Sequence, residues 1–188
     1  MTRPRILLLS GLLLIAVLAA VLVPVLTGHS VITGSDQPFG PQGGLSSECL
    51  PYYGGVPQTD GVIAVTNHAP QTATIERLSL GSPRRLRLIG AYIVPTTYVV
   101  MGAWRGWPPP RAAQHVPGTE WPRRHRPAGA QVRPGEKVSV VVGLALPSQV
   151  RQGGQGSSSG VTLRYRVGSQ QYLWHSNVQA VLKAARSC

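Results

Sequence analysis

The sequence predicts an all-β fold, a β-sandwich of about seven strands that follows one N-terminal transmembrane helix. The strand prediction rests on short β-branched runs separated by turn residues, with no long amphipathic helix pattern after residue 26. The clearest run is GVTLRYRV at 160–167, where apolar residues alternate with Thr and Arg as in a half-buried strand. The helix prediction rests on the charge-free run at 6–26.

Residues 6–26, ILLLSGLLLIAVLAAVLVPVL, carry no charge and follow a short tail, residues 1–5, that contains Arg3 and Arg5. A helix over this run would be about 31 Å long, close to the hydrocarbon thickness of a bilayer. The positive-inside preference then predicts a cytoplasmic tail, a single membrane span and an extracytoplasmic C-terminal domain. Because the run exceeds the about 7–15 residues of a cleavable signal peptide, we expect an uncleaved signal anchor, with secretion after cleavage as the alternative.

The segment 27–48 is rich in Gly, Ser and Pro, and it predicts a flexible linker of roughly 25 Å. The folded domain is then expected over 49–188, with the two cysteines, Cys49 and Cys188, at its two ends. An oxidising compartment permits these cysteines to form a disulfide bond.

Turn residues divide the rest of the chain into short runs, and the turns at 67–70, 81–83 and 133–136 are the clearest. The run at 86–94 is apolar on both parities, as in a strand covered on both faces. The last residues, 175–188, fit a helix by spacing and equally fit a final strand that returns Cys188 to Cys49. We expect strands at 61–66, 72–80, 86–94, 97–101, 137–146, 160–167 and 171–175.

VTNHAPQTATIERLSL at 65–80, together with RPGEKVSVVVGLAL at 133–146, resembles the strand–turn–strand layout of bacterial immunoglobulin-like surface modules. The resemblance implies an immunoglobulin-like sandwich and brings no functional residue with it. The sequence departs from such modules at Asn67–Pro70, where they usually place a glycine-bearing turn, and it lacks the buried tryptophan and paired cysteines of true immunoglobulin domains.

The segment 103–136 is the predicted long loop, and it contains WRGWPPPRAAQHVPGTEWPRRHRP. Long loops of this kind are usually functional or disordered. Interleaved Trp and Arg suit an anionic surface, whereas in the alternative reading Trp104 and Trp107 cap the core while the arginines stay solvated. The candidate binding residues are Trp104, Arg105, Trp107, Trp121, Arg123, Arg124 and Arg126.

The chain carries 18 Lys and Arg against 6 Asp and Glu, a formal charge of +12. This excess favours anionic partners such as lipid headgroups or wall polymers, with nucleic acid less favoured. With so few acids we predict no enzyme and no cofactor. A metal site at His115, Glu120 and His125 ranks last, because their spacing is no recognised ligand signature. Gly156–Gly160 matches G-x-S-x-G, but it lacks the strand before the serine and the helix after it, so we read it as a hairpin loop.

The sequence therefore predicts a membrane-anchored, extracytoplasmic binding or scaffold module of unknown ligand. The alternative, from a different class, is an accessory subunit that packs on an integral membrane protein.

Overall fold

The computed structural model describes residues 31–34, 36–40, 45–97 and 101–188. These residues belong to one compact unit that starts at Val31, and most of the regular structure in them is β. They contain no helix long and apolar enough to cross a membrane, and the predicted span at 6–26 lies outside them. The strands are β1 Ser46–Pro51, β2 Gln58–Thr66, β3 Ala73–Leu80, β4 Arg87–Pro95, β5 Gly102–Arg105, β6 Gln131–Val132, β7 Lys137–Ala145, β8 Gln155–Ser158, β9 Val161–Val167, β10 Gln170–His175 and β11 Val178–Lys183.

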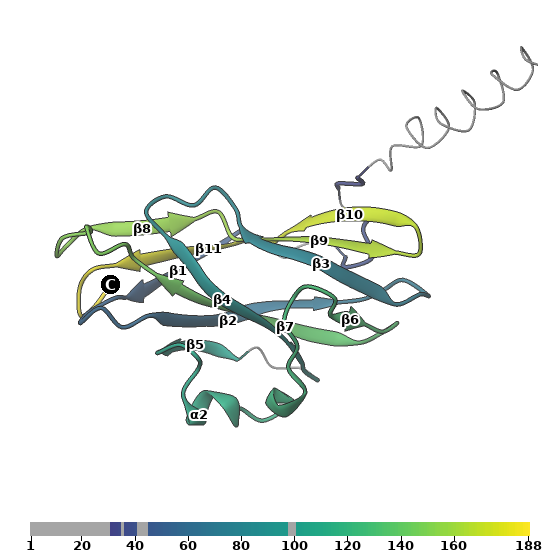
Figure 1. Ribbon diagram of the computed structural model, residues 1–188, viewed down its shortest axis with the longest axis horizontal. Coiled ribbons are helices and arrows are strands. Elements are labelled where there is room, and N and C mark those ends of the chain that lie inside the picture. Colours follow the sequence, from purple (N-terminus) through teal and green to yellow (C-terminus); the bar gives the residue numbers. More distant parts are fainter. Residues whose placement is uncertain (1–30, 35, 41–44, 98–100) are drawn as a thin grey trace, which may run out of the picture. The chain divides into compact units, whose positions relative to one another are not determined.

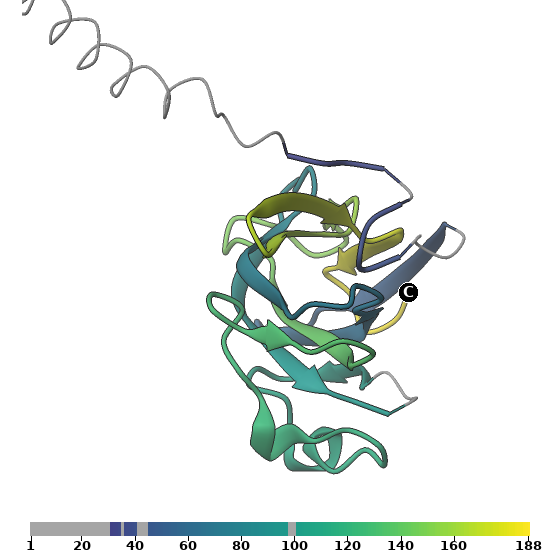
Figure 2. The same cartoon turned by 90° about the vertical axis from the view of Figure 1, so that its right-hand side faces the viewer.

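The strands form three sheets, with the orders β4-β7-β2-β5, β10-β9-β3-β6 and β1-β11-β8. The only parallel pairing among them joins β1 to β11, and all other paired strands are antiparallel. In Figure 1 the strands run nearly side by side, and the view along them in Figure 2 shows the sheets surrounding a common interior. This architecture is consistent with the predicted β-sandwich, although the described residues contain more strands than the predicted seven.

The main hydrophobic core fills this interior, and alternate residues of the strands supply it. In β9 the side chains of Val161, Leu163 and Tyr165 are buried, whereas Arg164 and Arg166 are exposed, which confirms the predicted alternation. Strand β7 is instead buried on both faces: its even-numbered residues from 138 to 144 are in the main core, and Val141 is in a second cluster. Burial of such apolar side chains is the main term that stabilises a sandwich of this kind.

Most predicted strands match observed ones, and the differences arise where pairing is non-local. The predicted strand at 97–101 is wrong in its described residues: Thr97 is a bend, Met101 is irregular, and the strand starts at Gly102. Strands β1, β6 and β8 were not predicted, because they are short and lack a period-two apolar pattern. Pairing with distant segments holds them in extended form: β1 and β8 pair with β11, β8 also bridges to Arg84, and β6 pairs with β3.

Residues 155–160 do not form the predicted hairpin loop. Strand β8 pairs with β11, whereas β9, which follows two residues later, pairs with β3 and β10. Ser159 and Gly160 are therefore a corner at which the chain passes from one sheet to another. Gly160 has φ +117, and a Cβ there would lie 2.6 Å from the carbonyl oxygen of Ser176, so the corner requires glycine.

The C-terminal segment, which sequence alone left open between helix and strand, is the strand β11. It lies parallel to β1, with Cys49 opposite Val181, and Cys188 forms a disulfide with Cys49 at a Cα–Cα distance of 6.0 Å. The predicted disulfide is thus present. It links residues separated by 139 positions, and closing so long a loop in the unfolded chain stabilises the fold by about 5 kcal/mol on entropic grounds.

The predicted flexible linker at 27–48 is corrected in its described residues, which belong to the domain. Ile32 extends the β10 edge, because its N–H donates to the carbonyl of Gln171 and its carbonyl accepts from the N–H of Leu173, both at 3.0 Å. Phe39 is 3% exposed and stacks on Tyr165 with ring centroids 4.0 Å apart. The domain therefore begins well before the predicted boundary at residue 49.

Candidate functional site

The segment 103–136 is not a structureless loop but a cover for the outer face of the β4-β7-β2-β5 sheet. It contains β5, the helix α2 Arg111–Gln114, the 3-10 helix η1 Trp121–Arg123 and β6. Figure 1 shows α2 and the neighbouring turns beneath this sheet. They enclose a second hydrophobic cluster, built from Val94, Met101, Ala113, Trp121 and Val141 with partly buried Tyr92, Trp104 and Trp107.

Trp107 occupies a place on the sheet where two strands lack side chains. Gly90 of β4 lies directly opposite Gly143 of β7, and the indole of Trp107 packs over this pair. A Cβ on Gly90 would lie 2.7 Å from Trp107 Cζ2, and one on Gly143 would lie closer still to the ring. The two glycines are therefore a floor for the indole, and they explain why both strand sequences are interrupted by glycine.

Aromatic contacts extend from Trp107 across the second cluster. The Tyr92 ring stacks on Trp107 at 5.5 Å and meets Trp121 edge-on at 5.3 Å. The Arg124 guanidinium lies 4.8 Å from the Trp121 ring centroid, so this arginine covers the cluster by a cation–π contact. Trp104 is half-buried and its Nε1 donates to the carbonyl of Met101 at 2.7 Å. The three tryptophans of the predicted binding loop thus serve packing.

The four arginines among the predicted site residues do not converge. Arg105 stacks on Tyr53 at 4.1 Å, Arg123 is paired with Glu120, and Arg124 lies on Trp121. Arg126 is exposed, with no ion pair among the described residues. The structure therefore favours the alternative reading of this segment, in which the tryptophans pack and the arginines stay solvated, over a shared Trp–Arg surface.

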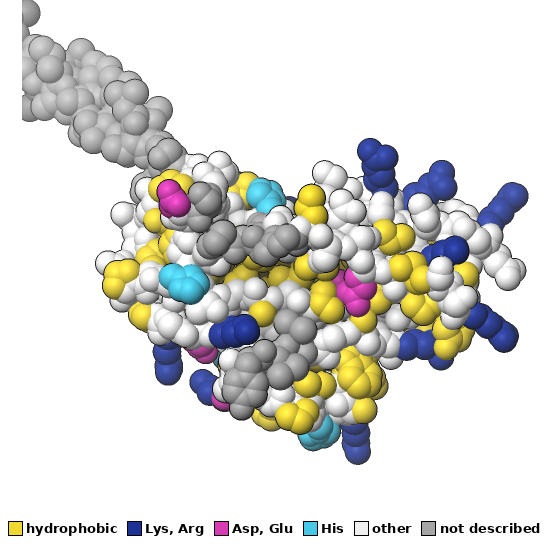
Figure 3. Space-filling model, turned by 180° about the vertical axis from the view of Figure 1, so that it is seen from behind, with side chains coloured by type: hydrophobic (Ala, Val, Ile, Leu, Met, Phe, Trp, Pro, Cys, Tyr) yellow, Lys and Arg dark blue, Asp and Glu magenta, His cyan; other side chains and the backbone are white. Residues whose placement is uncertain are grey.

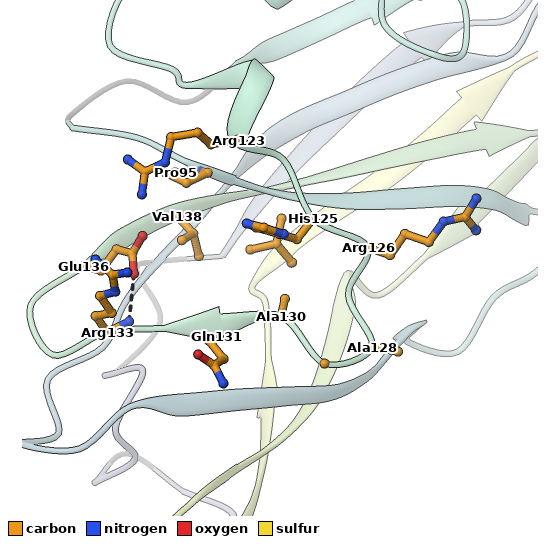
Figure 4. Close-up of a pocket in the computed structure, with 12 residues that line it drawn as sticks. Pro95, Arg123, His125, Arg126, Ala128, Ala130, Gln131, Arg133, Glu136 and Val138 are labelled. Atoms are coloured by element: carbon orange, nitrogen blue, oxygen red, sulfur yellow. Dashed lines mark hydrogen bonds between the residues drawn. The ribbon is translucent and has the colours of Figure 1, made fainter.

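A cavity of about 390 Å³ lies between this segment and the edge of β4, and Figure 4 shows its lining. His125 is held there by two backbone hydrogen bonds with Ile93, each of 2.9 Å. The side chains of Arg123 and Arg126 point away from His125, and the Glu136 carboxylate accepts from the N–H of Arg133 at 2.8 Å. The cavity has no convergent set of donors for an anion. Among the described residues, no three His, Cys, Asp or Glu side chains are grouped to hold a metal ion.

Cations from several segments gather at the end of the domain where β4 begins and β7 and β11 end. Figure 3 shows Lys and Arg side chains gathered at this end, at the right of the view. We call it the basic end, and the contacts among its strands and loops bring seven cations together: Arg84, Arg85, Arg87, Arg105, Arg151, Lys183 and Arg186. All but Lys183 are exposed. Sequence analysis missed this cluster because its members are spread over a hundred residues, and only the RR pair at 84–85 hinted at it.

A second cavity, of about 750 Å³, opens at the basic end. Its walls carry Tyr52, Tyr53, Arg87 and Arg186, and no acidic side chain lines it. A smaller cavity next to it is lined by Arg85 and Arg151, again without an acid. The volume of the larger cavity lies within the range of about 300–1,000 Å³ that is typical of small-molecule sites.

Two acids from different strands, Glu48 of β1 and Asp60 of β2, interact electrostatically. Asp60, 2% exposed, accepts a hydrogen bond from the N–H of Val62 at 3.1 Å. Burial raises the pKa of Asp60. Burial, and then the charge of Asp60, raise the pKa of Glu48 to about 7. Sequence analysis did not predict this pair, because β1 and β2 bring it together from different sheets.

The serine at the centre of the G-x-S-x-G match is structural. Ser158 is 4% exposed, and its hydroxyl donates to the carbonyl of Gly160 at 3.2 Å within the corner. No model of a known protein family matches the sequence, and a search of curated proteins finds no significant similarity, so the reading of this chain rests on its own residues.

Proposed function

We propose that this protein is a membrane-anchored, extracytoplasmic β-sandwich module that binds an anionic polymer of the cell envelope. The observation that carries the proposal is the basic end, where four of the seven cations line two cavities and no acid lines either cavity. The predicted resemblance to immunoglobulin-like surface modules is in keeping with binding, since such sandwiches bind ligands through loops at their ends.

The charge distribution favours a polyanion over a small neutral ligand. Like charges held together repel one another in the free protein, and an anionic polymer relieves this repulsion while it releases its own counterions. Among the described residues, ion pairs engage Arg123 and Arg166 and none of the basic-end cations. Apart from Arg105, which stacks on Tyr53, these side chains are therefore available to a partner.

The proposed anchor would hold the domain close to the membrane. Ile32 already belongs to the β10 edge, so the chain from Leu26 to Ile32 reaches at most about 21 Å. Figure 1 shows residues 31–34 and 36–40 near β10, whereas the C-terminus and β8 lie toward the other end of the domain. The first described residues and the basic end thus lie at different ends of the domain.

The test uses the full-length chain in neutral detergent, titrated with poly(glycerol phosphate) at low and high salt. We expect binding that weakens steeply as salt rises, and at least a ten-fold loss in the variant R84Q/R85Q/R87Q. The matched control R123Q/R124Q/R126Q removes the same charge from the 103–136 segment and should lose less than three-fold. A larger loss of affinity in R123Q/R124Q/R126Q than in R84Q/R85Q/R87Q would place polymer binding on the 103–136 segment instead. If the unaltered chain does not bind the polymer, the proposal is wrong.

An accessory subunit of a membrane protein is the second candidate, and three exposed apolar residues near the N-terminal side of the domain favour it. Val31 is 37% exposed, Ile32 40% and Leu45 85%. The test is copurification of a membrane protein in mild detergent. Copurification that persists in R84Q/R85Q/R87Q and is lost in the double variant Ile32→Ser with Leu45→Ser would support this candidate. Copurification unchanged by all of these substitutions would count against it.

A further inference from the structure

We propose that the 750 Å³ cavity at the basic end is a subsite for one sugar unit that carries a phosphate or carboxylate group. This inference rests on the proposed function and names the part of the polymer that is recognised. Four segments build the cavity: the turn from β1 to β2, the start of β4, the region where β7 ends, and the chain after β11.

The turn between β1 and β2 presents two adjacent aromatic rings in a fixed position. The N–H of Tyr52 donates to the carbonyl of Lys183 at 2.7 Å, and its hydroxyl donates to the carbonyl of Gly55 at 3.3 Å. Arg105 lies 4.1 Å from the Tyr53 ring centroid and donates to the Tyr53 carbonyl at 3.5 Å. Tyr53 nevertheless remains 38% exposed, so an aromatic surface is available to the apolar face of a sugar ring.

Anion-binding groups are supplied by other walls of the same cavity. Arg87 is the first residue of β4 and Arg186 lies in the segment after β11, and both are exposed and line the space. A guanidinium can donate two parallel hydrogen bonds to a phosphate or a carboxylate. The mixed lining, with Leu146, Pro147 and Val150 beside Ser148 and Gln152, suits a ligand that has both apolar and hydroxyl faces.

The disulfide bond fixes the wall that bears Arg186. This residue lies between Lys183, where β11 ends, and Cys188, which is bonded to Cys49 of β1. The segment is held at both ends, so ordering Arg186 around a ligand loses less entropy than ordering a free terminus would. A neighbouring backbone pair, in which the N–H of Gly153 donates to the carbonyl of Ala184 at 2.9 Å, holds the same segment from its other side.

The experiment titrates full-length protein with glucose 1-phosphate, glucuronate, glucose and inorganic phosphate by calorimetry. We expect saturable 1:1 binding of glucose 1-phosphate or of glucuronate, and the tighter of the two identifies the anionic group. Glucose alone and phosphate alone should bind at least ten-fold more weakly than the preferred sugar anion. Inorganic phosphate that binds as tightly as the sugar anion would overturn the sugar subsite.

Variants separate the cavity from the general charge of the basic end. R87Q and R186Q should each weaken binding of the sugar anion about ten-fold or more, since each removes a charged hydrogen bond. The control R84Q removes the same charge from a basic-end residue that does not line the cavity, and it should change affinity less than two-fold. Tyr53→Leu should weaken binding of the sugar anion but not of phosphate.

The two proposals fail in different ways. If poly(glycerol phosphate) binds but neither sugar anion does, or if R84Q weakens the sugar anion as much as R186Q, the subsite is wrong and polymer binding stands. If neither the polymer nor the sugar anions bind to a folded protein, the proposed function and the subsite both fail.

Discussion

Replacing Gly143 by alanine tests whether the 103–136 segment is held on the sheet by Trp107. The backbone of Gly143 does not need positive φ, so alanine is allowed by conformation and only the space decides. The new methyl group would overlap the indole of Trp107, which has to leave its place over Gly90 and give up its stacking on Tyr92 at 5.5 Å.

We expect this overlap to destabilise the domain by about 2–3 kcal/mol, the upper part of the range for overpacking, because a rigid indole rather than a flexible chain is in the way. Removing the ring in Trp107→Ala lowers stability by a similar amount, about 2–3 kcal/mol, since Trp107 is only partly buried. In the double variant the methyl group no longer meets the ring. The loss of stability should therefore be about 2 kcal/mol smaller than the sum of the losses in the two single variants.

Urea unfolding followed by tryptophan fluorescence and by circular dichroism measures all three variants. Gly153→Ala is the control, because Gly153 has φ +81 and no atom within 4 Å of its added Cβ, so only backbone strain of about 1 kcal/mol is expected. Stability of Gly143→Ala within 0.5 kcal/mol of the unaltered protein, or strict additivity in the double variant, would refute the packing argument.

Three further predictions concern the Glu48 carboxyl group, the Phe39 ring and the disulfide bond. Because the pKa of Glu48 is raised to about 7, the folded protein holds a proton that the unfolded chain releases near 4.5; stability should therefore decline as pH rises from 4.5 to 7. In Glu48→Gln this decline should shrink by about 1–2 kcal/mol, a figure reduced for partial exposure, and a pH series of urea unfolding that keeps its full slope would contradict the assignment. Phe39→Ala should cost about 3–4 kcal/mol because Phe39 is 3% exposed and stacked on Tyr165; a Tm equal to that of the unaltered protein would mean that residues 36–40 are not part of the core. Replacing both Cys49 and Cys188 by serine should lower stability by about 3–5 kcal/mol under oxidising conditions, and the difference should vanish when both proteins are measured with reductant.

The local pattern of the chain was sufficient for the strands whose side chains alternate or are uniformly apolar, such as 160–167 and 137–146. Their prediction succeeded because burial of one face imposes the period of two directly on the sequence. The disulfide was also predictable, since two cysteines at the ends of one domain leave a single intramolecular pairing. The short strands β1, β6 and β8 carry no such pattern, and their extended form depends on partners that are distant in the sequence.

The candidate site shows the same division. From sequence, the concentration of Trp and Arg at 104–127 drew attention because those residues are adjacent in the chain. The tertiary structure decided that the Trp107 indole packs over Gly90 and Gly143, which no local pattern connects to it. It also assembled the basic end from Arg87, Arg186 and their neighbours, and it brought Glu48 within the influence of Asp60. Composition determined that this protein carries a large positive charge. Only the arrangement of the strands in space determined where the cations gather. The reason is that electrostatic and packing interactions depend on distance in space and not on separation along the chain.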